Sequence, residues 1–326
     1  MSELIAVDSV DIQILVDNAT DTLSSVPSFV ETEAAGMARR GLRIMGGKCL
    51  CCAAHGLSCL VTVRRGGESR SLLFDSGPEE YAFERNVTRL AVDLGVAESV
   101  VLSHGHWDHS GAMLLALTMI RNRNTGKRVP FYAHPGMFRT RGVTQADGSV
   151  RPMEDVPSPE DLTLFGADVV QTRDPQYPLG GHFYVSGEIR RQTPFERGYP
   201  GQVRRSDDGA GWEPDELLID ERFVAVNVAG KGLVVLSACS HAGIVNVCLH
   251  AREQFPGVPL FAILGGLHLS GANEAAIPQT VEALREFGLT AIAAGHCTGW
   301  RAMTALANAF GDKVLAPSAV GKRYRF

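Results

Sequence analysis

Three apolar segments in the last third of the chain each end at or near a histidine and lead into a helical pattern. They are residues 231–241 (KGLVVLSACSH), 258–270 (VPLFAILGGLHLS) and 289–299 (LTAIAAGHCTG). Strands that alternate with helices in this way predict βα units and a parallel sheet. Ligands of such sheets bind at the carboxyl ends of the strands. The repeated placement of His241, His268 and His296 therefore predicts an α/β fold with a polar site at one sheet edge.

The rest of the chain carries similar patterns around one weaker region. Strand patterns occur at 11–16, 57–63, 71–77, 98–104 and 128–134, and helix patterns at 81–94 and 112–122. The second and third of these strands are joined by a Gly-containing turn, which predicts a hairpin. From about 140 to 222 the pattern weakens, and Pro, Gly, Asp and Arg accumulate. We expect one domain over residues 1–326, with 140–222 forming hairpins or an inserted lid over a site.

The segment VVLSHGHWDHSG, residues 100–111, gathers three of the 10 histidines of the chain around one aspartate. His104 and His106 are two residues apart in an extended segment, so their side chains point the same way and can bind one ion. Asp108 and His109 follow on the first turn of a predicted helix and can bind an ion beside the first. Imidazole and carboxylate ligands suit zinc, and iron or manganese remain open. The cluster predicts one or two metal ions, whose bound water is acidic enough to supply hydroxide at neutral pH.

Composition and charge argue against several other classes of protein. The net charge of −5 gives no support to a nucleic-acid-binding surface. The first residues lack the features of a signal peptide, and no apolar run approaches the roughly 20 residues of a membrane span. Seven cysteines, an odd number, predict reduced thiols. We expect a cytoplasmic protein that acts on a small molecule, with no nucleic acid or membrane as partner; a homodimer remains open.

The cysteines of CLCCAAHGLSC, residues 49–59, raise the alternative of a separate zinc or iron–sulfur site. Such sites typically use paired Cys-x2-Cys motifs, and the chain offers no second pair. We therefore expect Cys49, Cys51, Cys52 and Cys59 to be small thiols packed beside a strand. The chain also lacks the Gly-x-Gly-x-x-Gly pattern of a dinucleotide site, so no such cofactor is expected.

The segment HGHWDH resembles the His-x-His-x-Asp-His signature of the metallo-β-lactamase superfamily. Further motifs follow the order of one branch of that superfamily: VDNAT (16–20), HGLS (55–58), SGEIRR (186–191), CSHAGIVN (239–246), GGLHL (265–269) and GHCTG (295–299). They resemble the branch called ribofuranosylaminobenzene-phosphate-synthase-like or dihydropterin-related metal-dependent hydrolases. The resemblance implies an α/β fold in the form of a four-layer αβ/βα sandwich.

The resemblance also implies roles for individual residues. Four residues match the core metal motif directly: His104, His106, Asp108 and His109. His296, in GHCTG, matches the last histidine of the family pattern. Asp75, in FDSG (74–77), is expected to lie behind the ligands and to orient a metal-binding imidazole.

The family pattern departs from this chain at one strand. Where the superfamily usually places a bridging aspartate, the chain has Cys239, Ser240 and His241. We expect His241 to be a metal ligand and leave His268 as either a ligand or a partner of one. The departure leaves open whether the chain binds one metal ion or two.

The leading functional prediction is a metal-dependent hydrolase, in which a metal-bound hydroxide attacks an ester, a phosphoester or a related centre. Asp108 and Asp75 are the expected catalytic carboxylates. Arg190, in the arginine-rich part of the weak region, is expected to bind an anionic substrate, and His55 to line the pocket. The branch name favours an alternative, a pterin- or aminobenzene-phosphate-related synthase on the same metal site. A low-turnover ligand-binding sensor is a third alternative.

Overall fold

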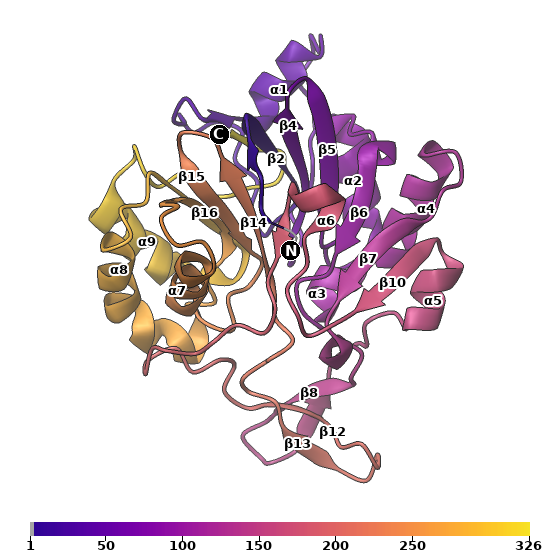
Figure 1. The fold of residues 1–326 in the computed structure, drawn as a ribbon, viewed down its shortest axis with the longest axis vertical. Helices are drawn as coiled ribbons and strands as arrows, with labels where there is room; N and C mark the ends of the chain where they lie inside the picture. Colours follow the sequence, from indigo (N-terminus) through magenta and orange to yellow (C-terminus); the bar gives the residue numbers. More distant parts are fainter. Residues whose placement is uncertain (1–2) are drawn as a thin grey trace.

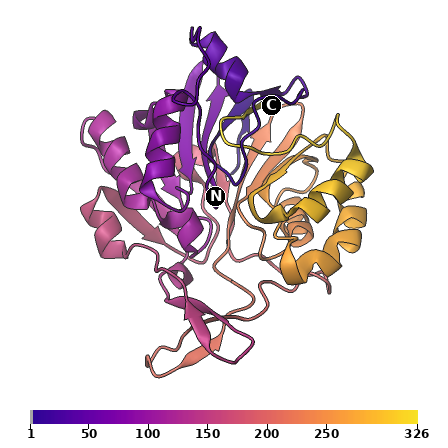
Figure 2. The ribbon, with the colours of Figure 1, turned by 180° about the vertical axis from the view of Figure 1, so that it is seen from behind.

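Two β-sheets face each other at the centre of the structure, a computed structural model that describes residues 3–326. Helices cover the outer face of each sheet, which gives four layers (Figure 1). Helices α2 (Glu80–Leu90) and α4 (Met113–Arg123) cover the sheet of the N-terminal half. Helices α7 (Ile244–Gln254), α8 (Ile277–Arg285) and α9 (Trp300–Phe310) cover the other sheet, as Figure 2 shows from behind. The predicted αβ/βα sandwich is confirmed.

The sheet of the N-terminal half has eight strands in the order β10-β7-β6-β5-β4-β2-β18-β3. These strands are β2 (Ser9–Val16), β3 (Val30–Glu31), β4 (Ser58–Arg65), β5 (Glu68–Phe74), β6 (Ala97–Val101), β7 (Val129–Ala133), β10 (Ala167–Gln171) and β18 (Arg323–Arg325). Strands β4 and β5 form the predicted antiparallel hairpin. Strands β5, β6, β7 and β10 run parallel, so their carboxyl ends lie along one edge.

The second sheet contains the three predicted βα units. Its order is β1-β14-β15-β16-β17, and β11 pairs with β14. The strands are β1 (Ala6–Val7), β11 (Tyr184–Val185), β14 (Phe223–Val228), β15 (Gly232–Ser237), β16 (Leu260–Gly266) and β17 (Ala291–Gly295). Strands β15, β16 and β17 run parallel, and a helix follows each of them. Their carboxyl ends therefore deliver His241, His268 and His296 to one edge, as the sequence predicts.

Alternation along the strands explains why each sheet is covered on both faces. In β5, Leu72 and Phe74 pack between the two sheets, whereas Leu73 packs against the outer helices. In β15, Val234 packs between the sheets and Val235 packs toward the helices of its own side. Successive strand residues point to opposite faces, so a strand that is apolar at every position is buried between two layers.

The weak region expected at 140–222 divides between two structures. Residues 159–185 complete the sandwich, because α5 (Pro159–Leu164) leads into β10, which joins the first sheet, and β11 joins the second. Only the flanking parts form a separate four-stranded sheet, ordered β13-β12-β8-β9, which protrudes at the lower end of Figure 1. We call this sheet the flap: β8 (Arg141–Thr144), β9 (Val150–Pro152), β12 (Gln202–Arg205) and β13 (Trp212–Pro214).

The remaining helices are short. They include α1 (Glu33–Arg39), α3 (Trp107–Ser110) and α6 (Pro178–Gly181). Within residues 3–326, no helix combines the length and the apolar character needed to cross a bilayer.

Candidate metal centre

The predicted metal motif lies in the connection between β6 and α3. Ser103 and His104 follow the strand, and His106 is the N-cap of α3. Gly105 separates the two histidines at a point where a side chain would not fit, because a Cβ there would meet the guanidinium of Arg141 and the backbone of Met137. The motif therefore faces the second sheet from a tightly enclosed turn.

Three buried histidines form the first group of ligand atoms. Nε2 of His104 lies 2.9 Å from Nδ1 of His106 and 3.2 Å from Nε2 of His241. Ligand nitrogens on a tetrahedral zinc ion, with bonds of roughly 2.0–2.1 Å, lie roughly 3.3 Å apart. The spacing therefore fits one shared ion. His241 comes from the loop after β15, so this group joins the two halves of the sandwich.

A second group lies beside the first and contains Asp108, His109 and His296. Nε2 of His109 lies 3.2 Å from Nε2 of His296, and Oδ2 of Asp108 lies 3.7 Å and 3.5 Å from these two nitrogens. All the ligand atoms of this group lie within 4.8 Å of one another. The donors are again imidazole and carboxylate, so the residues present fit a second ion.

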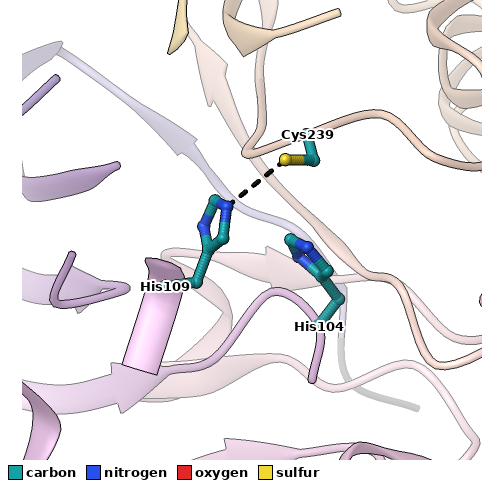
Figure 3. Close-up of side chains that lie close together, drawn as sticks. All are labelled: His104, His109 and Cys239. Carbon is teal, nitrogen blue, oxygen red and sulfur yellow. Dashed lines mark hydrogen bonds between the residues drawn. The ribbon is translucent and has the colours of Figure 1, made fainter. Parts of the chain in front are cut away.

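Cys239 lies between the two groups; the sequence left open whether it, His241 or His268 completes the site. Its Sγ is 3.3 Å from Nε2 of His109 and 3.2 Å from Nε2 of His296, and it also groups with His104 (Figure 3). The residue follows β15, at the place where the family pattern has its bridging aspartate. A thiolate is a strong zinc ligand, so Cys239 can offer a sulfur donor where the family pattern has a carboxylate. The replacement was visible in the sequence, but its position relative to the histidines was not.

Hydrogen bonds on the remote ring nitrogens orient four of these imidazoles. The remote nitrogen of His104 lies 2.9 Å from Ser103 Oγ, and the remote nitrogen of His106 lies 2.6 Å from Gln202 Oε1. The remote nitrogen of His109 lies 2.7 Å from Asp75 Oδ2, and the remote nitrogen of His296 lies 3.0 Å from Asn18 Oδ1. Such outer partners fix the tautomer and the orientation of metal-binding histidines. Gln202 belongs to β12, so the flap takes part in building the centre.

Asp75 occupies the position that the sequence predicts for it. It follows β5 with a φ of 58° and accepts hydrogen bonds from the backbone N–H and the hydroxyl of Ser103. Its third contact, to His109, leaves it buried with no direct access to the pocket. The side chain is therefore placed to orient His109 and does not line the pocket, which gives Asp75 a positioning role in place of the expected catalytic one.

His241 is held differently from the other ligands. Its Nδ1 is buried without a hydrogen-bond partner. Instead, the buried carboxylate of Glu221 accepts hydrogen bonds from the backbone N–H groups of His241 and Ala242, at 2.7 Å and 2.6 Å. Burial raises the pKa of Glu221 to about 7. Glu221 therefore positions the loop rather than the ring.

Burial keeps several imidazoles in the form that binds metal. It lowers the pKa of His106 to about 4 and holds the pKa values of His104 and His241 well below the ordinary value. Burial alone would raise the pKa of Asp108, but His109 and His296 outweigh it and lower that pKa. Neutral imidazole and ionised carboxylate are the protonation states that metal coordination requires.

A pocket of about 770 Å³ opens over the metal centre. Its floor contains ligands of both groups, including His106 and Asp108. Its walls include Trp107 from α3, Tyr199 from the segment before β12, and Arg151 from β9. The pocket therefore joins the metal centre to the flap.

His55 lines this pocket, as the sequence predicts. Its Nδ1 lies 3.0 Å from Nδ2 of Asn18, and its Nε2 lies 3.6 Å from Oδ2 of Asp108. The side chain of His55 is 59% exposed, whereas the ligand histidines are buried.

Comparison with known proteins identifies the family. No family model matches the chain. A curated protein of Methanocaldococcus jannaschii, 7,8-dihydropterin-6-methyl-4-(beta-D-ribofuranosyl)-aminobenzene-5'-phosphate synthase, is 30% identical over 250 residues, covering 76% of this chain and 82% of that protein. The chain belongs to the metallo-β-lactamase superfamily, in the branch that includes this synthase. An uncharacterised protein of the same organism is 26% identical over 256 residues, covering 78% of this chain and 88% of its own length.

Solved structures show the same fold. A metal-dependent hydrolase of the β-lactamase superfamily superposes with a TM-score of 0.70 at 21% identity, covering 96% of this chain and 98% of its own. Unliganded yeast PDE1 superposes with a TM-score of 0.53 at 10% identity, covering 99% and 100% of the two chains. The superfamily fold implies an enzyme that binds divalent metal, and the two ligand groups supply the donors.

Two of the site residues predicted from the sequence lie outside the two ligand groups. His268 follows β16 and belongs to neither group, although its ring centroid is 4.2 Å from that of His241. Arg190 lies on the surface, 74% exposed, and pairs with Glu253 of α7 at 3.4 Å. It is absent from the residues that line the pocket, so the structure does not support it as an anion-binding residue. The segment after β11 runs along α7 and carries Arg190 away from the centre.

The cysteines of residues 49–59 belong to none of the ligand groups. Cys51 is buried, and its backbone N–H donates to Glu33. Cys52 donates from its backbone to Asn86 of α2. Cys59 is buried within β4. Within the described chain, no three of these side chains converge with other donors as the histidines of the centre do.

Proposed function

We propose that the protein is a zinc-dependent hydrolase of small anionic esters or phosphoesters. The observation that carries the proposal is the pair of adjacent ligand groups at the floor of an open pocket. Zinc suits the mixture of imidazole, carboxylate and thiolate donors better than manganese, because the thiolate of Cys239 is a soft ligand. When bound, the metal supplies Lewis-acid polarisation of the attacked group and a nucleophile at neutral pH.

The residues around the metals have separate tasks. Asp108 contributes negative charge at the floor, and Asp75 holds His109 in one orientation. Trp107 and Tyr199 offer flat apolar surfaces on the pocket walls. His55 lies where a substrate would pass into the centre. These side chains would hold a substrate with an aromatic part and place its reacting group at the floor.

Arg151 is the residue that we propose for anion recognition. It is the one arginine or lysine among the residues that line the pocket, and no ion-pair partner is found for it within residues 3–326. A free guanidinium can donate two parallel hydrogen bonds to a phosphate or carboxylate. Glu154 also lines the pocket and would repel an anion, so the attraction for an anionic substrate would come from Arg151.

Replacing Arg151 by alanine should lower kcat/KM for an anionic substrate by about 10- to 100-fold. The loss corresponds to roughly 1.5–3 kcal/mol for a hydrogen bond to a charged group. Steady-state kinetics with an anionic substrate and a neutral analogue of similar size provide the measurement, together with the metal content. The neutral analogue should be affected little.

Arg190→Ala is the matched control, because Arg190 is also an exposed arginine but lies on α7's side of the molecule. It should change kcat/KM for neither substrate by more than about twofold, since an exposed ion pair contributes little. If Arg190→Ala causes the larger loss, or if the neutral analogue suffers as much as the anion, Arg151 is not the anion-binding residue.

A synthase is the second candidate, and the relative from Methanocaldococcus jannaschii favours it. The name of that relative's product contains a pterin, an aminobenzene and a phosphate. Aromatic walls and one free arginine also suit such a molecule. The proposed pocket chemistry is thus shared by the two candidates, and only the reaction differs.

Assays of the zinc-loaded protein distinguish these candidates. We expect hydrolysis within a panel of phosphodiesters, phosphomonoesters and lactones, and no turnover after chelation. Absence of hydrolysis together with product formed only from a phosphoribosyl donor would establish the synthase instead. Tight small-molecule binding without any turnover would indicate a sensor. All seven cysteines are free thiols, which supports the cytoplasm as the proposed location.

A further inference from the structure

A third group of donors lies next to the two ligand groups described above. It consists of Cys239, His268 and Cys297, whose ligand atoms all lie within 4.8 Å of one another. The residues follow β15, β16 and β17, which are neighbouring parallel strands. The same topology that assembles the metal centre therefore places two thiols and an imidazole side by side.

The two sulfur atoms are close enough to share one ion. Sγ of Cys297 lies 3.4 Å from Sγ of Cys239. Two thiolates on a tetrahedral ion, with metal–sulfur bonds of roughly 2.3 Å, lie roughly 3.8 Å apart. The pair therefore needs only a small adjustment to bind a metal, and it carries no disulfide.

Cys297 has an ordinary hydrogen-bond acceptor, whereas one ring nitrogen of His268 has no partner. The thiol of Cys297 can donate to the backbone carbonyl oxygen of Cys239, at 3.4 Å. His268, in contrast, has a φ of 44°, in the left-handed region that side chains rarely adopt, and its Nδ1 is buried without a partner. A residue that is held in an unfavourable conformation with an unsatisfied polar atom frequently belongs to a functional site.

The three residues are also accessible from the same pocket. All of them line the pocket of about 770 Å³. Structural zinc sites are closed by four protein ligands, whereas catalytic sites keep one position open. Three protein ligands on the pocket wall therefore correspond to a site with one open coordination position.

We infer that Cys239, His268 and Cys297 form a third metal subsite, which binds a soft ion such as Zn²⁺ or Cd²⁺ on the pocket wall. Cys239 also groups with His104 and His109 of the metal centre, and thiolates can bridge two ions. The inference does not depend on which reaction the protein catalyses, because it concerns the number of ions bound.

Metal titration of the full chain tests this subsite. Metal-free protein is loaded with excess Zn²⁺ or Cd²⁺, desalted, and measured by elemental analysis; the thiolate-to-cadmium charge-transfer absorption is recorded in parallel. We expect three ions per chain for the parent, and two for Cys297→Ser and for His268→Ala. The cadmium–thiolate absorption of Cys297→Ser should fall to about half, since Cys239 remains.

Cys49→Ser is the matched control, because Cys49 is a free, partly exposed thiol in the loop before β4. It should keep three ions and the full absorption. The inference is overturned if the parent saturates at two ions, a result that needs no variant, or if both substitutions at the subsite leave three ions bound. Circular dichroism of each variant verifies that a lower count does not reflect unfolding.

Discussion

His106→Ala should remove at least one metal ion per chain and lower turnover more than about 100-fold, while the protein stays folded. His106 contributes Nδ1 to the group with His104 and His241, and its substitution leaves two ligands there. Loss of an outer partner of a metal ligand already costs roughly 10- to 100-fold in affinity or activity, so loss of the ligand itself should cost more. Elemental analysis, kinetics and thermal unfolding provide the three measurements.

The fold should survive because its core does not depend on the metal. Three apolar clusters, between the sheets and under each helical layer, hold the sandwich together. His182→Ala is the control: His182 is a partly buried histidine whose ring donates a hydrogen bond to the backbone carbonyl oxygen of Leu179 and is in none of the ligand groups. It should retain metal and activity. Gross unfolding of His106→Ala, or full activity without the ion, would contradict the assignment of this group.

Arg141→Met should lower the free energy of unfolding by about 3–5 kcal/mol, because it leaves the buried carboxylate of Asp220 without its ion-pair partner. The guanidinium is 3% exposed and pairs with Asp215 and Asp220, both at 2.8 Å. It also donates to the carbonyl oxygen of Gly105, and Asp220 accepts from the N–H of the same residue. Arg141 thus joins the flap to the metal motif.

Urea unfolding of the metal-free protein measures this loss without a contribution from bound ions. Arg139→Met is the matched control in the same region, because Arg139 forms an exposed ion pair with Asp207. Exposed pairs contribute about 0–1 kcal/mol, so this variant should resemble the parent. Metal affinity should fall in Arg141→Met alone, since Arg141 donates to Gly105 and Arg139 does not. Equal stability of the two variants would show that the buried network is not what secures the flap.

Local patterns were sufficient for most of the sandwich and for the histidines of the centre. The apolar runs that became β6, β15, β16 and β17 are buried on both faces, and such strands have a recognisable continuous pattern. Each is followed by a helix, which implies parallel strands with aligned carboxyl ends. The position of a histidine just after such a strand therefore predicts the sheet edge at which it lies. His241 follows from this rule, although the family pattern offered no counterpart for it.

The structure of the region from 140 to 222 was harder to predict from the sequence, because its strands are short and pair with distant partners. β10 joins β7 and β11 joins β14, and nothing in the local sequence marks these pairings. The flap strands have three or four residues each and are mostly half-buried or exposed, so they lack a clear apolar alternation. The sequence predicted hairpins or an inserted lid over this region and thus treated it as one unit. In the structure the region contributes strands to three sheets.

The sequence by itself determined the residue types of the metal centre, because a His-x-His-x-Asp-His motif after a buried strand is a local feature of the chain. Only the tertiary structure decided how the donors divide: Cys239 between two ligand groups, His268 beside Cys297, and Arg151 rather than Arg190 over the pocket. The physical reason is the distance along the chain. Cys239 lies 130 residues from His109 and contacts it at 3.3 Å only because two sheets pack face to face. Such a contact depends on the burial of apolar surface between the layers, which no short motif encodes.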